Sequence, residues 1–220
     1  MIPDIRHYQT IVFDCDGVIL DSNNVKTRAF HAAALARGQK AANDLVDYHV
    51  SHGGISRYKK FDYFLRHIIG KDPEEGELQA LLDVYGHEVR SGLRTCAIAP
   101  GLQELRRATA GARWLVVSGG DQNELRDVFA ERKLAHLFDC GIYGSPDTKD
   151  AILAREIRDN NIKAPAIFLG DSRYDHEAAT RAGLEFVFVS GWSEFVDWQA
   201  YLERLSVPSV HSLQALCGQS

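Results

Sequence analysis

Two aspartates one residue apart, Asp14 and Asp16, follow a short apolar run and precede Gly17. Two unit charges roughly 4 Å apart repel by about 4 kcal/mol at an effective dielectric of about 20, so a nearby cation or a shifted pKa must compensate. Such a pair can set a nucleophilic carboxylate beside a second carboxyl group that carries a proton. For this segment taken alone, an Asp-Gly turn at the end of a strand is the simpler alternative.

A serine and two glycines, Ser118, Gly119 and Gly120, follow a second apolar run. A hydroxyl group with bare backbone N–H groups at the start of a helix suits a phosphate group. A plain Ser-Gly-Gly turn with Asp121 as the helix cap is an equal alternative. Lys149 is at the start of a later predicted helix, where a cation is unfavourable beside the helix dipole unless an anion or a group of acids compensates. The alternative is a solvated side chain, as for most lone lysines.

Two more acids, Asp171 and Asp175, follow a third apolar run and bring the number of candidate acids to four. Carboxylate oxygens of this kind suit Mg²⁺, which binds proteins through one or two carboxylates, waters and substrate phosphate. Capping of the next helix by Asp171 or Ser172 accounts for one of these side chains but not for the set. We therefore expect a Mg²⁺ site that also binds phosphate.

The elements that must position these residues are short apolar runs that alternate with helix-like segments. This alternation predicts an α/β fold with a parallel sheet. At the carboxyl ends of its strands, where ligands collect in such sheets, the polar residues above should meet. The predicted strands cover residues 11–13, 114–117, 140–143, 166–169 and 186–189.

Between residues 23 and 94 the pattern changes, because no strand is evident and helical stretches follow one another. Helices are predicted over residues 24–37, 43–52, 56–69 and 73–93, with breaks at Gly53-Gly54 and around Pro73. We expect residues 1–22 and 95–220 to form an α/β core and residues 23–94 to form an inserted helical domain.

Composition narrows the class of function. The chain has 220 residues, a formal net charge of −5 and 45% hydrophobic residues, as in an ordinary globular protein without a general attraction to nucleic acid or anionic membranes. Four separated cysteines suggest neither a zinc site nor a disulfide framework. No membrane span or targeting segment is evident, so we expect a cytoplasmic protein that acts on a small molecule.

These motifs resemble the haloacid dehalogenase (HAD) superfamily, in the helical-cap subgroup that includes phosphoglycolate phosphatase and β-phosphoglucomutase. The resemblance covers essentially the full length, and the motifs occur in the family's order: Asp14-Cys15-Asp16-Gly17-Val18, Ser118, Lys149, and Gly170-Asp171-Ser172 with Asp175. It implies a Rossmann-like core and a cap over the active site formed by the helical insertion.

The resemblance also implies roles for these residues. Asp14 would be the nucleophile that forms an aspartyl-phosphate, and Asp16 would act first as the acid and then as the base. Asp14, the backbone carbonyl of Asp16, and Asp171 would hold Mg²⁺, with Asp175 assisting or orienting. The phosphoryl oxygens would be bound by three residues: Ser118, Gly119 and Lys149.

In the cap, Gly53-Gly54-Ile55-Ser56-Arg57 is similar to the subgroup's specificity loop, and Arg57 matches a position where some members bind phosphate. Lys26 stands near a place where many members have His, so Asn23 and Lys26 are further candidate substrate contacts. For Lys59 and Lys60 a solvated helix face is the favoured interpretation. His49 and His52 are likewise expected to face solvent rather than bind metal.

The leading hypothesis is a Mg²⁺-dependent phosphatase that acts on a small phosphorylated metabolite, a sugar phosphate or a hydroxy-acid phosphate. A phosphomutase of the β-phosphoglucomutase type is the enzymatic alternative, and a catalytically silent binding protein with the same fold is the other. Because Asp16 is present, true dehalogenases and phosphonoacetaldehyde hydrolases fit less well. The sequence leaves the choice of substrate and that between monomer and dimer open.

Overall fold

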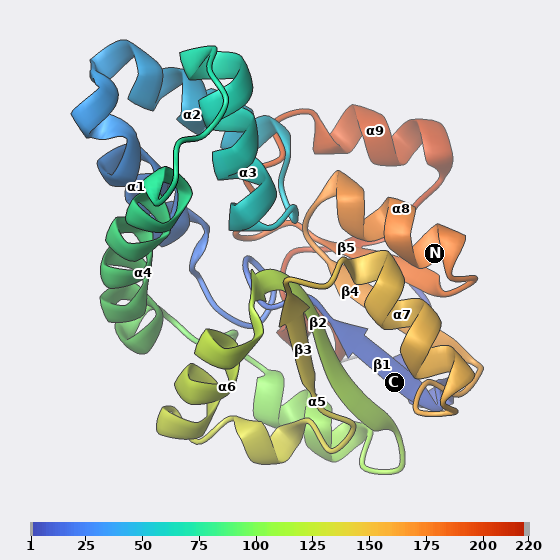
Figure 1. The fold of residues 1–220 in the computed structure, drawn as a ribbon. Coiled ribbons are helices and arrows are strands. Elements are labelled where there is room, and N and C mark those ends of the chain that lie inside the picture. The colour runs from blue at the N-terminus through green and yellow to red at the C-terminus, as the bar shows by residue number, and fades with distance from the viewer. Residues whose placement is uncertain (1, 218–220) are drawn as a thin grey trace.

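A six-stranded sheet organises the computed structural model, which describes residues 2–217 (Figure 1). The strand order is β3-β2-β1-β4-β5-β6, and every neighbouring pair is parallel. The strands are β1 (Thr10–Phe13), β2 (Arg113–Asp121), β3 (Ile142–Ser145), β4 (Ala166–Gly170), β5 (Glu185–Val189) and β6 (Ser209–Val210). The predicted α/β fold with a parallel sheet is confirmed.

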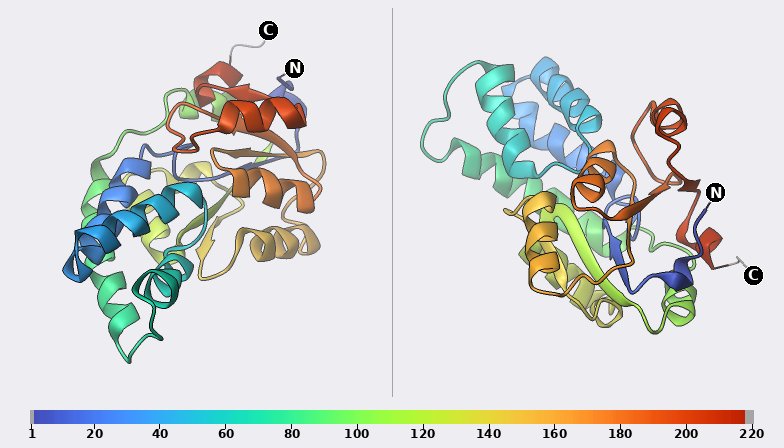
Figure 2. Two further views of the ribbon diagram at one scale, coloured as in Figure 1. Left: turned by 90° about the horizontal axis from the view of Figure 1, so that it is seen from above. Right: turned by 90° about the vertical axis from the view of Figure 1, so that its right-hand side faces the viewer.

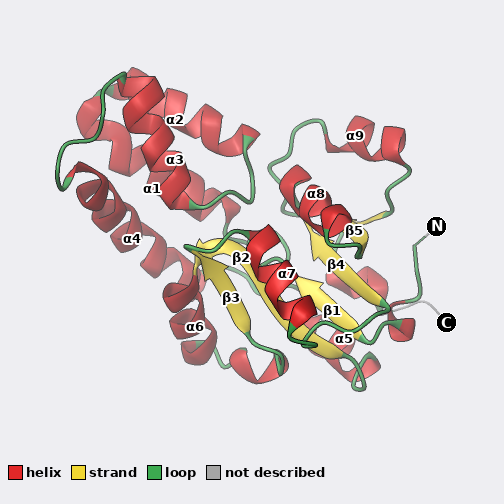
Figure 3. Ribbon diagram, turned by 45° about the vertical axis from the view of Figure 1, so that its right-hand side comes forward, coloured by secondary structure: helices red, strands yellow, loops and turns green. Residues whose placement is uncertain are grey.

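Helices cover both faces of this sheet, so its central strands β1 and β4 are buried at every position (Figure 3). Ile11 and Phe13 of β1 join one buried cluster with α5 (Leu102–Ala108) and α6 (Gln122–Glu131). Val12 joins the cluster on the opposite face, which includes residues of α7 (Lys149–Arg158), α8 (Arg173–Arg181) and α9 (Trp198–Leu205). Successive side chains of a strand therefore anchor helices on opposite sides.

The chain between β1 and α5 forms a helical block to one side of the sheet, as both views of Figure 2 show. It contains α1 (Asn23–Ala34), α2 (Gln39–Ser51), α3 (Arg57–Tyr63), which continues as a π-helical turn over Phe64–Ile69, and α4 (Glu77–Thr95). The rings of Phe30 and Tyr85 lie 4.5 Å apart in its interior, and those of Phe30 and Phe61 lie 5.1 Å apart. We call this block, α1 to α4, the cap.

Details of the strand ends differ from the prediction. The segment Ser118-Gly119-Gly120 belongs to the extended end of β2, where the pairing with β3 shifts register between Val117 and Asp121, rather than to a turn after the strand. β3 begins two residues later than predicted, and β6 was not predicted, because two residues are too few to show a pattern. No described helix has the length and apolar character needed to cross a membrane.

Candidate functional site

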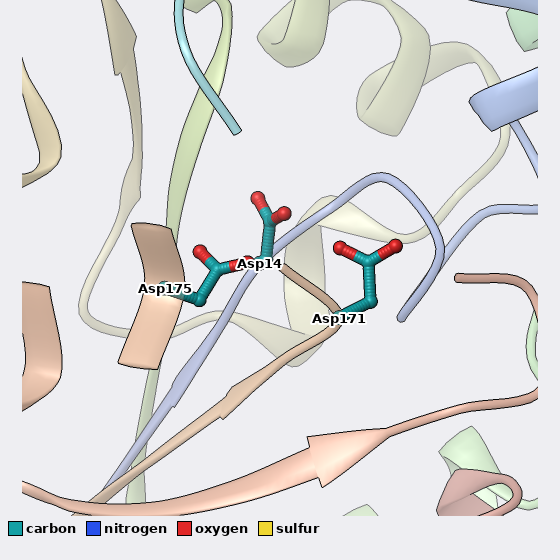
Figure 4. Close-up of side chains that lie close together, drawn as sticks. All are labelled: Asp14, Asp171 and Asp175. Carbon is teal, nitrogen blue, oxygen red and sulfur yellow. The ribbon is translucent and has the colours of Figure 1, made fainter. Parts of the chain in front are cut away.

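Three buried carboxylates meet at the carboxyl edge of the sheet (Figure 4). Asp14 follows β1, Asp171 follows β4, and Asp175 lies in the first turn of α8. One carboxylate oxygen from each lies within 4.8 Å of those of the other two, and no side chain of the three is more than slightly exposed. The predicted meeting of these acids therefore occurs, because β1 and β4 are neighbours that end at the same edge.

Lys149 supplies a positive charge to this cluster. It is the first residue of α7, is 1% exposed, and makes ion pairs with Asp14 and Asp175. Its Nζ lies 3.0 Å from Asp14 Oδ1, but this oxygen is buried without a hydrogen-bond donor of suitable geometry. The acids compensate for the unfavourable position of a cation at a helix N-terminus. Although burial opposes its charge, they also raise the pKa of Lys149.

Two acids of the cluster, Asp14 and Asp171, both have raised pKa values. Burial, together with the charges of Asp175 and Asp16, raises the pKa of Asp14 to about 7 despite the neighbouring Lys149. Burial and the charge of Asp14 raise the pKa of Asp171 well above its ordinary value. Carboxylates in this state need a cation for both to ionise at neutral pH. The arrangement therefore fits a divalent metal ion held by oxygen ligands.

Asp175 and Asp171 have different partners. The carboxylate of Asp175 accepts hydrogen bonds from Lys149 and from the backbone N–H and hydroxyl of Ser172, at 3.1 and 2.6 Å, so both of its oxygens are engaged. These bonds complete a capping box at the start of α8. Asp171 Oδ2 accepts a hydrogen bond of 2.7 Å from the side-chain amide of Asn23.

Asp16 lies beside the other acids with partners of its own. It accepts hydrogen bonds from the Ser22 hydroxyl, at 2.6 Å, and from the Lys26 ammonium. Although burial opposes ionisation, Lys26 holds the pKa of Asp16 below its ordinary value. Gly17 turns the chain here with φ +72°, and a Cβ atom on it would lie 2.0 Å from Asp171 Oδ2. Only glycine allows this turn beside Asp171.

The end of β2 meets the cap. A Cβ atom on Gly119 would lie 2.2 Å from the backbone oxygen of Gly54, and one on Gly54 would lie 2.8 Å from Ser172 Oγ. The buried Ser118 hydroxyl accepts a hydrogen bond from the backbone N–H of Gly120. Asp121 caps α6, as predicted, by accepting from the N–H groups of the first turn. The cap loop between α2 and α3, which contains Gly54, therefore contacts the core directly.

A pocket lies between the cap and the core, with room of about 60 Å³ for the centres of water-sized molecules. Its walls combine the acids with cap residues, including Asp14, Asp16, Asn23, Lys26, His49, Arg57, Lys60, Tyr85, Gly119, Asp171 and Glu194. Since a single water needs about 10–15 Å³ on this measure, the space holds about four to six waters while the cap is in this position, and a whole phosphate ester needs the cap to shift.

The three predicted cap residues line this pocket but already have partners. Lys26 pairs with Asp16, and the Asn23 amide donates to Asp171 and to the Trp192 carbonyl. Arg57 pairs with Glu124 of α6, with 3.1 Å between Nη1 and Oε2, and lies over the ring of Tyr85 at 4.5 Å.

Two predictions of exposed residues were wrong. Lys60 is 1% exposed and His49 is 8% exposed, whereas Lys59 is exposed as predicted. The burial of both residues could have been predicted from the sequence, because residues four apart share a helix face. Lys60 stands four residues before Phe64, and His49 stands four residues after Leu45, both of which are buried.

Comparisons with known proteins identify the chain's relatives. The sequence model of haloacid dehalogenase-like hydrolases matches residues 8–183. No curated protein matches the sequence. Solved structures with similar folds include a predicted phosphatase from Clostridium acetobutylicum, at 20% identity and TM-score 0.72, covering 96% of each chain.

Two other similar structures have more specific names. One is β-phosphoglucomutase from Clostridium difficile, at 20% identity and TM-score 0.72, covering 94% of this chain and 92% of that one. The other is CbbY from Rhodobacter sphaeroides in complex with xylulose-(1,5)bisphosphate, at 20% identity and TM-score 0.67, covering 94% of this chain and 95% of that one. At such low identity the likeness concerns the fold.

Proposed function

Since the chain belongs to the haloacid dehalogenase-like hydrolases, we propose that it is a Mg²⁺-dependent phosphatase acting on a small phosphorylated metabolite through an aspartyl-phosphate intermediate. The substrate would be a sugar phosphate or a hydroxy-acid phosphate. The observation that carries the proposal is the buried Asp14 carboxylate, which lines the pocket close to Lys149 and Asp171 and has an oxygen without a hydrogen-bond donor among the described residues.

Asp14 suits the nucleophile. Its carboxylate would attack phosphorus in line with the departing alcohol, so that one P–O bond forms as the other breaks. Lys149 would pair with phosphoryl oxygens as negative charge is redistributed, since its ammonium already lies at the carboxylate. Ser118 and the backbone N–H of Gly119 are the proposed further contacts to the phosphoryl group.

Asp14 and Asp171 are the proposed direct side-chain ligands of Mg²⁺, with the backbone carbonyl of Asp16. Because both oxygens of Asp175 are engaged by Lys149 and Ser172, Asp175 is better suited to orienting Lys149 than to direct ligation. The bound ion would let Asp14 and Asp171 ionise together and would neutralise charge on the phosphoryl group.

Asp16 is the proposed acid and base. In the first step it would protonate the departing oxygen, and in the second it would take a proton from the water that attacks the aspartyl-phosphate. Lys26 favours the ionised form, which is the form that the second step requires. The first step requires the proton that this neighbour disfavours, so substrate binding must loosen the contact between Asp16 and Lys26.

Phosphate release from a panel of phosphate monoesters with Mg²⁺ tests the function. The variant Asp14→Asn should release none while keeping the wild-type thermal unfolding temperature, whereas Asp47→Asn, an exposed acid of α2, should be unaffected. Turnover by Asp14→Asn would contradict the role of the nucleophile. With an aryl phosphate, whose departing phenolate needs little help from an acid, the intact mass of Asp16→Asn should increase by one phosphoryl group, because hydrolysis of the intermediate needs the base.

The products distinguish the other functions. An isomerised phosphate ester with little free phosphate would identify a phosphomutase, which the fold also accommodates in one of the similar structures. Metal binding without turnover of any ester would favour a catalytically silent protein.

A further inference from the structure

The buried pair Lys60 and His49 lies in the pocket wall, and the proposed chemistry does not use it. Lys60 comes from α3 and His49 from α2. The Lys60 ammonium donates to His49 Nδ1 at 2.6 Å and to the His49 backbone oxygen at 3.2 Å. Within residues 2–217, no carboxylate oxygen lies within 4.0 Å of the Lys60 nitrogen. The ammonium is therefore buried without a counter-charge in direct contact.

The contact between the two side chains fixes the tautomer of His49. While Lys60 carries its proton, its ammonium group has only hydrogens to offer, so Nδ1 accepts and the ring proton is on Nε2. Nε2 is buried and has no hydrogen-bond partner among the residues that the structure describes. The nearest acid is Glu194, whose Oε2 lies 3.9 Å away, which is too far for a hydrogen bond.

Two donors therefore remain unused at this wall of the pocket. One is the Nε2–H of His49, and the other is the third hydrogen of the Lys60 ammonium. A buried donor without an acceptor is unfavourable, and a buried charge without a partner is more so. The carboxylates of Asp16 and Glu124 do not relieve this state, because Asp16 pairs with Lys26 and Glu124 with Arg57.

We propose that Lys60 and His49 form an anion subsite in the cap, and that the substrate is a phosphate monoester with a second anionic group, a carboxylate or another phosphate. The reacting phosphate would lie at Asp14, and the second anionic group would accept hydrogen bonds from Lys60 Nζ and His49 Nε2, because both residues line the same pocket as Asp14. This inference rests on the proposed phosphatase function. It adds a requirement on the substrate that the core residues do not impose.

Two matched pairs of esters test the requirement. Phosphoglycolate is compared with hydroxyethyl phosphate for a carboxylate, and propanediol bisphosphate with propanediol monophosphate for a second phosphate. The wild type should prefer the anionic member of at least one pair, which also identifies the group. Lys60→Met should lower kcat/KM for that ester by about 30-fold or more, mainly through KM, and leave the neutral ester unchanged. Lys59→Met, the exposed neighbour, should change neither.

The outcomes separate this inference from the function on which it rests. Hydrolysis of a wide range of esters without preference for anionic members would overturn the subsite and leave the phosphatase standing. If no ester is hydrolysed, calorimetry with Asp14→Asn still measures binding of the anionic esters. If the double variant Asp14→Asn, Lys60→Met binds the anionic esters as tightly as Asp14→Asn does, the subsite is overturned.

NMR spectroscopy gives a further readout, whose first measurement needs neither a ligand nor a variant. Below about pH 7, where Lys60 carries its proton, the ¹⁵N shifts of His49 in the free wild-type protein should be those of a neutral ring with the proton on Nε2. Addition of the preferred anionic ester to the Asp14→Asn protein should move the Nε2 signal, and the neutral ester should not. A proton on Nδ1 in the free protein would overturn the assignment of donors.

Discussion

Replacing Lys60 by Met should change how the stability of the protein depends on pH. Lys60 is almost fully buried in α3, and burial, followed by repulsion from Lys26, lowers its pKa from 10.5 to about 7. The other ionisable groups acting on it are Asp16, Glu194 and Lys149, with His49 in direct contact.

The direction of the effect follows from where the proton is bound. Between about pH 7 and about pH 10.5 the folded protein holds a neutral amine, while the unfolded chain still binds the proton. The free energy of unfolding rises with pH wherever the unfolded state binds more protons. A shift of about 3.5 pKa units corresponds to about 5 kcal/mol, which is the upper limit of the gain in wild-type stability across this range.

Urea unfolding of the wild type and Lys60→Met at several values between about pH 6 and about pH 10, in metal-free buffer, measures the effect. The difference in the free energy of unfolding between the two proteins should change by several kcal/mol in favour of the wild type as the pH rises. Lys59→Met should follow the wild type. A difference that is independent of pH would refute the inference that burial lowers the pKa of Lys60.

Three further predictions concern the core and its contact with the cap. Lys26→Met should raise the pKa of Asp16 and move the acidic limb of the pH–activity profile to higher pH, because in the wild type the Lys26 ammonium stabilises the Asp16 carboxylate. An acidic limb that stays at the wild-type pH would contradict this prediction. Gly119→Ala should lower kcat/KM about tenfold or more, because the added methyl group would displace the carbonyl of Gly54 and with it the cap loop between α2 and α3. Wild-type kinetics in this variant would contradict the prediction and show that the loop moves freely. Chelation by EDTA should abolish phosphate release and Mg²⁺ should restore it, whereas activity in EDTA would exclude the proposed metal site.

The core acids were predictable because their positions depend on a general property of parallel sheets. Asp14 and Asp171 follow neighbouring strands, so the strand pattern alone brings them to one edge. Asp175 follows from Asp171, because a helix beginning at Ser172 returns its first turn to the same place.

The cap was predictable as helices but not as a set of contacts. The partner of Arg57 is Glu124, which stands on the core helix α6, and a pairing between two separate parts of the chain leaves no local pattern. The burial of Lys60 depends on α2 as well as on its own helix, since both of its acceptors belong to His49. The charge of Lys60 and the apparent amphipathicity of its helix instead predicted that this side chain faces solvent.

Asn23 has a consequence for any attempt to exchange caps between relatives. Its one amide nitrogen, in the first residue of α1, donates at 2.7 Å to Asp171 and at 2.8 Å to the Trp192 carbonyl. The junction of a grafted cap would thus sit one hydrogen bond from a carboxylate that the chemistry depends on. A chimera joined after residue 23 takes this asparagine from the recipient and should keep the hydrogen bond that positions Asp171. A chimera joined before residue 23 takes the donor's side chain at this position instead.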